Sequence, residues 1–341
     1  MLLKVTRFLG GQGLPFRGRD ESDQSGNRGN FIELLEMLAK DNEKLKSRLQ
    51  KRYGHYCSPE LQNEFIALFS DVITENICEE VREARFYAVM ADETTDKSKS
   101  KQLAILIRYV NTRRGEIKER AVGLHHLQDC GAESITNTIV DTLDSKHLDI
   151  HNCVGQCYDG ASVMKGCNSG VQKRFREHAP HALYFHCYAH QLNLVLVHVM
   201  SGVDEANDFF CSLQNLHKFI MNSSVRHELF VEAQKRVDST ATVLTLERSS
   251  QTRWFYWYKS EKRVRETFKA IVIVLDEEPN DRAESIGILA QIQQNNFIFL
   301  LHAMERLLGL TFSLSMQLQT VNLDLSAVVT LVDSTLQEIV K

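Results

Sequence analysis

The sequence predicts an α/β protein whose sheet-forming core lies between two helical regions. Three observations predict this class. Apolar runs of strand length cluster in the middle of the chain, amphipathic helical spacing precedes them, and helical spacing dominates from about residue 203 onward. No unit of about 20 to 50 residues repeats, so the pattern does not indicate a solenoid. We therefore divide the 341 residues into N-terminal helices over 1–85, a core over 86–198 and a helical region over 199–341.

The N-terminal region begins with a segment of mixed composition. Residues 1–30 are rich in Gly, Asp, Ser and Arg, which by itself is typical of a flexible segment. A helix is expected from Phe31, with Asn30 as its cap. A longer amphipathic helix is expected over 61–84, where apolar residues recur three or four apart: Phe65, Leu68, Phe69, Val72, Ile73 and Ile77.

Five apolar runs of strand length follow these helices. The sequence RRGE separates the second run from the third and is typical of a hairpin turn. Helices are expected between the later runs, over 131–148 and Ser162–His178, and after the last run, over 190–200. The five runs are residues 85–92, 102–112, 117–127, 149–159 and 182–188.

Composition restricts the class of protein. With 43% hydrophobic and 25% charged residues the chain is an ordinary globular protein, and we find no apolar run of the roughly 18–20 residues that a membrane span needs. No signal peptide is recognisable, so the eight scattered cysteines are expected as reduced thiols in an intracellular protein without a membrane partner. The net charge of −4 means that any nucleic-acid contact must come from local clusters of Lys and Arg.

Two acidic residues stand where apolar runs end. Asp92 closes the first predicted strand in FYAVMADETTD, and Asp159 closes the fourth in CYDGASVMKG. If those strands are neighbours, both carboxylates reach the same edge of the sheet, where ligands of α/β sheets bind. Paired carboxylates suit Mg²⁺ or Mn²⁺, and two such ions about 4 Å apart can clamp a phosphodiester during displacement. The small residues after Asp159 would let a nucleic-acid backbone approach closely.

A simpler interpretation explains the same two acids. Asp92 precedes Glu93-Thr94-Thr95 and Asp159 precedes Gly160-Ala161-Ser162, and aspartate is common in both settings as a helix or turn cap. From spacing alone, capping is the stronger reading.

Three further clusters each allow two interpretations. Cys187 and His190 offer only two zinc ligands where a structural zinc needs four, so we favour a local hydrogen-bonded turn. The basic residues Lys165, Lys173, Arg174 and Arg176 follow Asp159 and suit either phosphate contacts or a solvated helix face. The segment RWFYWYKSEKRVR, which contains Arg253 and Trp254, could bind unpaired DNA, but burial of its aromatics in a helical core is the stronger reading.

Together, the motifs resemble a known family. MADETTDKSKSKQLAILIRYV, CYDGASVMKG and FHCYAHQLNLVL resemble hAT-superfamily transposases, and in particular the transposon-derived proteins related to MYM-type zinc-finger proteins. The opening FLGGQGLPFRGRDESDQSGNRGNFIELL is similar to the region that precedes the catalytic core in that group. The resemblance implies an RNase H-like mixed sheet interrupted by a large helical insertion, here over 199–341.

The resemblance also implies particular residues and partners. Asp92 and Asp159 correspond to the first two acidic metal ligands, Cys187 and His190 to a Cys-x-x-His motif, and Trp254 beside Arg253 to a tryptophan that stacks on an unpaired base. Implied partners are Mg²⁺ or Mn²⁺, DNA such as transposon ends or hairpins, and a second copy of the chain. The implied location is the nucleus.

The departures from the family pattern are equally specific. Within 321–341 no glutamate stands in the surroundings expected of the third metal ligand, and no Cys-x-x-Cys pair of a DNA-binding finger occurs. The final apolar pattern has no stop signal, so we expect a truncated insertion and an incomplete catalytic set. We therefore expect a transposase-derived fragment without strand-transfer activity. The alternative is a domesticated nuclear scaffold that binds protein or DNA and keeps the fold.

Overall fold

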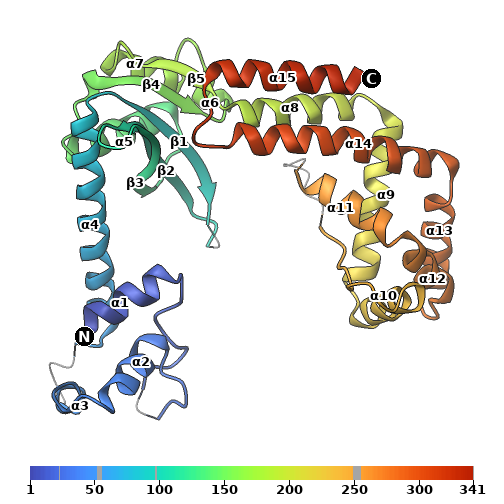
Figure 1. Cartoon of the computed structure of the whole chain (residues 1–341), viewed down its shortest axis with the longest axis horizontal. Coiled ribbons are helices and arrows are strands. Elements are labelled where there is room, and N and C mark those ends of the chain that lie inside the picture. The colour runs from blue at the N-terminus through green and yellow to red at the C-terminus, as the bar shows by residue number, and fades with distance from the viewer. Residues whose placement is uncertain (23, 52–55, 97, 249–254, 341) are drawn as a thin grey trace. The chain divides into compact units, whose positions relative to one another are not determined.

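The computed structural model describes the whole chain except residues 23, 52–55, 97, 249–254 and 341 (Figure 1). The described residues form two compact units. The first comprises Met1–Cys130, Ser134–Val154 and Glu177–Ala182, and the second comprises Gly131–Glu133, Gly155–Arg176 and Leu183–Lys341.

One five-stranded sheet has the strand order β3-β2-β1-β4-β5. The pairs β1/β2 and β2/β3 are antiparallel, whereas β4/β5 is parallel, so the sheet is mixed. The predicted α/β class with a mixed sheet is confirmed. The strands are β1 (Tyr87–Thr95), β2 (Lys101–Asn111), β3 (Glu116–His126), β4 (Cys153–Tyr158) and β5 (Leu183–His186).

The β1–β3 meander forms because its residues alternate between a buried and an open face. Val89 and Ala91 on β1 are buried with Ile105 and Ile107 on β2, as the period of two requires. The predicted turn between β2 and β3 is present, and Gly115 there has a φ of +66°, which glycine adopts without steric cost.

Four helices precede the sheet: α1 (Leu2–Gly11), α2 (Asn30–Ala39), α3 (Glu43–Leu49) and α4 (Pro59–Ala84). The expectation of flexibility for residues 1–30 was wrong for its described part. The Asn30 side chain donates to the Pro15 carbonyl at 2.8 Å, and Arg17 donates to Asn63 Oδ1 at 2.7 Å. Composition misled because glycine allows two backbone segments to approach closely, here at Gly18 and Gly29.

Asn30 is also not the cap of α2. Gly29 occupies that position with a φ of +93°, and the Asn30 side chain is engaged by Pro15 instead. The helix α4 begins as its sequence suggests, with Ser58 accepting from the Leu61 amide and Pro59 in the first turn.

Helix α4 packs unevenly along its length. Near its C-terminus Cys78 and Val81 are buried, where the helix lies against β2 and β3 (Figure 1). In the middle of the helix Leu68, Val72 and Ile73 are 55%, 60% and 56% exposed. The predicted helix is therefore present, but much of its apolar face lies open.

Between the strands lie α5 (Ala132–Ser145), the 3₁₀ turn η1 (Ile150–Asn152), α6 (Ser162–Lys165) and α7 (Val171–His178). The prediction of one continuous helix over Ser162–His178 was wrong, because the helix is interrupted between α6 and α7. The backbones of Gly166 and Gly170 meet there, with the Gly170 amide donating to the Gly166 carbonyl at 3.0 Å. A side chain at Gly170 would overlap Gly166.

The second unit continues with eight helices among its described residues. Its core is aromatic: Phe210 meets Trp257 edge to face at a centroid distance of 4.4 Å, and Phe209 contacts Phe297 at 5.1 Å. The helices are α8 (Tyr188–Ser201), α9 (Asp204–Met221), α10 (Ser224–Val237), α11 (Phe255–Glu266), α12 (Phe268–Glu277), α13 (Arg282–Ile292), α14 (Asn295–Leu318) and α15 (Leu325–Val340).

Among the described residues only α14 is long and apolar enough to cross a membrane by length and composition. Its residues Phe297, Leu301 and Leu308 are buried in the core of the helical unit, where α14 packs against α8, α11 and α15. A core helix of a globular unit passes the same test, so this helix is weak evidence for a membrane span.

Candidate functional site

Asp159 is the first residue after β4, as predicted. The residue is half-buried, and its carboxylate accepts a hydrogen bond from the Ala161 amide at Oδ1, at 3.0 Å. Among the described residues no donor reaches the other oxygen, Oδ2. The next residue, Gly160, has a φ of +78°, which lets the chain turn sharply into α6. The turn therefore holds one carboxylate oxygen and leaves the other available.

A histidine from β5 packs onto this turn. His186 Nε2 lies 2.8 Å from the Asp159 carbonyl oxygen, and a side chain at Gly160 would overlap the His186 ring. Because a carbonyl oxygen can only accept, Nε2 carries the hydrogen. Position 160 therefore requires glycine for two reasons: its φ is positive, and the His186 ring occupies the space that a side chain would need.

Cys187 and His190 lie close to the residues that form the Asp159 turn. The Cys187 amide donates to the Tyr158 carbonyl at 3.0 Å, which extends the β4/β5 ladder into the start of α8. The His190 ring lies 5.8 Å from the His186 ring, centroid to centroid. The two motif residues therefore border the Asp159 turn.

Asp92 differs from its prediction. It does not close its strand, because β1 continues to Thr95 and Asp92 stands in register with Ala104 of β2. The strand continues because Glu93, Thr94 and Thr95 still find register partners on β2. Asp92 is exposed and follows the buried Ala91, so it lies on the open face.

The described part of the chain contains no group of three His, Cys, Asp or Glu side chains placed to hold one metal ion. A zinc site at Cys187 and His190 therefore lacks its further ligands within those residues. Any divalent cation at Asp159 would take many of its ligands from water, as Mg²⁺ commonly does.

The predicted basic residues lie on α6 and α7. Lys165 and Lys173 are exposed, and Arg174 is half-buried with its guanidinium 3.7 Å from Glu133. The ion pair partly neutralises Arg174.

Arg253 and Trp254 lie outside the described residues. Two aromatics that follow them are part of the helical core: Trp257 is 4% exposed, and Tyr258 packs against Phe312 at 4.9 Å. Tyr256 is 38% exposed. Within α11 the basic and aromatic pattern thus reflects packing on one side and solvent on the other.

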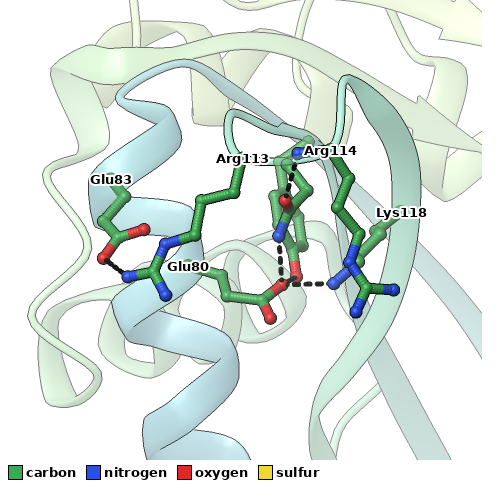
Figure 2. Close-up of polar contacts among 7 residues, drawn as sticks. Glu80, Glu83, Arg113, Arg114 and Lys118 are labelled. Atoms are coloured by element: carbon green, nitrogen blue, oxygen red, sulfur yellow. Dashed lines mark hydrogen bonds and ion pairs between the residues drawn. The ribbon is translucent and has the colours of Figure 1, made fainter.

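A polar cluster in the first unit was not predicted. Glu80 of α4 accepts from Tyr109, Asn111 and Lys118, at 2.6, 3.0 and 2.7 Å (Figure 2). These bonds, with Lys118 contributing most, lower the pKa of Glu80 to about 2. No sequence signal could have found it, because the partners lie about 30 or more residues away on strands whose register was unknown.

Comparison with known proteins finds a similarity over the first half of the chain. Residues 1–170 match the model of the DUF4371 family, described as "ZMYM1/FAM200, RNase-like domain". The "52 kDa repressor of the inhibitor of the protein kinase" of Mus musculus is 24% identical over 294 residues, and the Homo sapiens protein of the same name is 24% identical over 205 residues.

These alignments cover 81% and 57% of this chain, but only 37% and 26% of the mouse and human proteins. The chain therefore spans well under half the length of these relatives. The matched segment 1–170 includes the Asp159 turn and strands β1 to β4. Residues 1–170 are thus similar to an RNase-like domain of the ZMYM1/FAM200 type.

Proposed function

We propose that this chain derives from a hAT-type DNA transposase with an RNase H-like core, and that it binds a divalent cation through Asp92 and Asp159 without carrying out strand transfer. The observation that supports the proposal most directly is the turn after β4. It leaves one oxygen of a half-buried aspartate without a protein donor among the described residues.

The strand order supports the choice of the second ligand. The strand that carries Asp92, β1, is the neighbour of β4 in the sheet. A hard cation that takes one oxygen from each of two carboxylates and completes its shell with water fits this donor set. When bound, Mg²⁺ or Mn²⁺ would polarise a phosphate oxygen of DNA.

The incomplete ligand set is the reason for proposing binding without catalysis. Two-metal phosphodiester chemistry needs several carboxylates that hold both ions, and the described residues offer no group of three acidic, His or Cys ligands. We therefore expect weak cation binding and no cutting or joining of DNA strands by this chain.

Cation binding can be tested by titrating Mn²⁺ into the full chain and following its electron paramagnetic resonance signal. Asp159→Asn and Asp92→Asn should each weaken the affinity about tenfold or more. Asp141→Asn, which changes an exposed acid on α5, serves as the matched control. Binding that is the same in wild type and Asp159→Asn would refute the site.

Catalysis is tested separately with hairpin DNA in Mg²⁺ or Mn²⁺. We expect no nicking by wild type. Nicking that disappears in Asp92→Ala would show instead that the chain keeps an active transposase-type centre.

For DNA we propose that Lys165, Lys173 and Arg174 contact phosphates, and that Trp254, beside Arg253, stacks on an unpaired base. Lys165→Ala with Lys173→Ala should weaken the binding of hairpin DNA and reduce the salt dependence of the affinity by close to two phosphate contacts. Lys235→Ala with Arg236→Ala on α10 offers a control of equal charge change. An equal loss of affinity in both pairs would indicate nonspecific attraction alone.

A second candidate is a nuclear interaction scaffold that keeps the fold. The exposed apolar residues Leu68, Val72 and Ile73 on α4 favour it, because open apolar strips of this kind mark protein contacts. The relatives' name as repressors points to the same class and to a nuclear location. If α4 joins two copies of the chain, Leu68→Gln with Val72→Gln should convert a dimer to a monomer in analytical ultracentrifugation, whereas Val225→Gln on α10 should not.

A further inference from the structure

We propose that His186 is the positioning residue of the Asp159 turn: its ring and Nε2 hydrogen hold the peptide from which the Asp159 carboxylate projects. The effect of His186 on metal affinity rests on the proposed function. Its effect on the geometry of the turn rests on contacts within the second unit alone.

The first step is the location of His186. It is the last residue of β5 and stands in register with Tyr158, the last residue of β4. In a parallel pair this places the His186 side chain beside the first residue that leaves β4, which is Asp159. Strand pairing therefore delivers the ring to the turn without any contribution from local sequence.

The second step is the hydrogen bond. His186 Nε2 donates to the Asp159 carbonyl at 2.8 Å, while the Cys187 amide donates to the Tyr158 carbonyl at 3.0 Å. The carbonyls of Tyr158 and Asp159, which flank the Asp159 Cα, are thus each held by one of two successive residues, Cys187 and His186. The backbone of Asp159 has little freedom to rotate as long as both bonds persist.

The third step is the carboxylate. The Ala161 amide donates to Asp159 Oδ1 at 3.0 Å across Gly160. This bond spans Gly160, whose φ is +78°, and the His186 ring lies against Gly160 on the side where a side chain would stand. The ring therefore closes the space into which the turn could otherwise relax.

His190 connects the Cys-x-x-His motif to the contact between His186 and the Asp159 turn. Its ring lies 5.8 Å from the His186 ring with an interplanar angle of 40°. In this arrangement His190, in the first turn of α8, limits the rotation of His186 about its own side-chain bonds. The motif then acts on Asp159 through His186 and needs no zinc.

Two polar substitutions of similar size separate positioning from packing. His186→Gln places an amide nitrogen near the position of Nε2 and can still donate to the Asp159 carbonyl, whereas the amide of His186→Asn is too short to reach it. His198→Asn, on the exposed side of α8, is the control. All three should fold, as checked by circular dichroism.

The local readout is the Ala161 amide proton, followed by NMR hydrogen exchange in the full chain. In His186→Asn it should exchange at least about fivefold faster than in wild type, because its acceptor is no longer held. In His186→Gln the exchange should stay within about twofold of wild type, and in His198→Asn it should not change. Equal exchange in wild type and His186→Asn would overturn the proposal, as would equal acceleration in the Asn and Gln variants.

The metal readout is the Mn²⁺ affinity of the same proteins. Loss of an outer-shell partner commonly costs about 10- to 100-fold in affinity, so His186→Asn should weaken binding about tenfold and His186→Gln should restore most of it. If Asp159→Asn weakens Mn²⁺ binding but His186→Asn does not, the positioning role fails and the metal site stands. If Asp159→Asn has no effect, the metal site fails and Ala161 exchange alone decides the role of His186.

Discussion

Lys118 Nζ lies 2.7 Å from Glu80 Oε2, and this ion pair joins strand β3 to helix α4. Lys118 is 16% exposed and Glu80 38%, so the pair is only partly screened by water. Asn111 and Tyr109 of β2 donate to the same carboxylate, and Arg113 at the hairpin turn pairs with Glu83 one turn along α4 (Figure 2). The carboxylates of one helix thus fix the register of a hairpin against it.

Glu80→Gln should lower the free energy of unfolding by about 1–2 kcal/mol at pH 7, because the amide keeps an acceptor but loses the charge that three donors face. The measurement is urea unfolding followed by circular dichroism. Glu79→Gln, an exposed neighbour on the same helix, should change the free energy by less than about 0.5 kcal/mol.

The contribution of Glu80 depends on pH in a fixed direction. Its pKa falls from an ordinary value of 4.5 to about 2 on folding, so its stabilisation is complete above about pH 4.5 and disappears as pH falls toward 2. The difference between wild type and Glu80→Gln should therefore shrink between those pH values. A difference that stays constant down to pH 2 would show that the charge of Glu80 contributes nothing.

Elements whose pattern is set by near neighbours were predictable from the sequence. The meander β1–β3 follows from alternation and a turn sequence, and α4 follows from its periodicity and its Ser-Pro start. The broken helix at Gly166 and Gly170 was not predictable in the same way. Helical spacing continues across the break and outweighed the loop-like sequence Gly-Cys-Asn-Ser-Gly at 166–170, where the two glycine backbones meet.

The same distinction between local patterns and distant contacts applies to the candidate site. Asp159 could be found because an acid followed by Gly-Ala-Ser after an apolar run marks a strand end. The end of the first strand was predicted too early, at Asp92 instead of Thr95, because a polar residue on the open face of a strand resembles the end of a strand. The link from His186 to Asp159 joins residues 27 apart through β4/β5 pairing, which no local pattern encodes.

Gly160→Ala and Gly115→Ala separate backbone strain from the loss of His186 packing. Both glycines have positive φ, +78° and +66°, so alanine should cost about 1 kcal/mol at either position. Nothing lies near a side chain at Gly115, whereas one at Gly160 would overlap His186 and push the ring off the turn. Urea unfolding should show the larger loss in Gly160→Ala, and the NMR signals of the His186 ring should move only there. Equal losses with an unmoved ring would mean that the turn adapts.

Glu261 should make the helical unit less stable as pH rises. Its side chain is fully buried on α11, no described residue donates to either carboxylate oxygen, and burial followed by repulsion from Glu305 raises its pKa from 4.5 to about 9. The folded state then holds a proton that the unfolded chain releases above about pH 4.5. Stability should therefore fall between pH 4.5 and 9 and level off above that range.

Glu261→Gln removes this titration. Thermal unfolding between pH 5 and 9 should show a flatter profile than wild type, with a gain of about 2 kcal/mol at pH 8. Glu228→Gln, an exposed acid on α10, should leave the wild-type slope unchanged. A slope that survives in Glu261→Gln would assign the pH dependence to another group.

Trp257 and Tyr256 distinguish a packing role from a nucleic-acid role for the aromatics of α11. Trp257 lies edge to face with Phe210 in the core, so Trp257→Ala should cost about 3–5 kcal/mol in unfolding free energy. Tyr256→Ala, at an exposed neighbouring position, should cost less than about 1 kcal/mol.

If exposed aromatics of this helix stack on bases, Tyr256→Ala should weaken the binding of single-stranded DNA by about 1–3 kcal/mol in a fluorescence anisotropy titration. An unchanged affinity would leave α11 with packing as its function, because the buried Trp257 face is already occupied by Phe210.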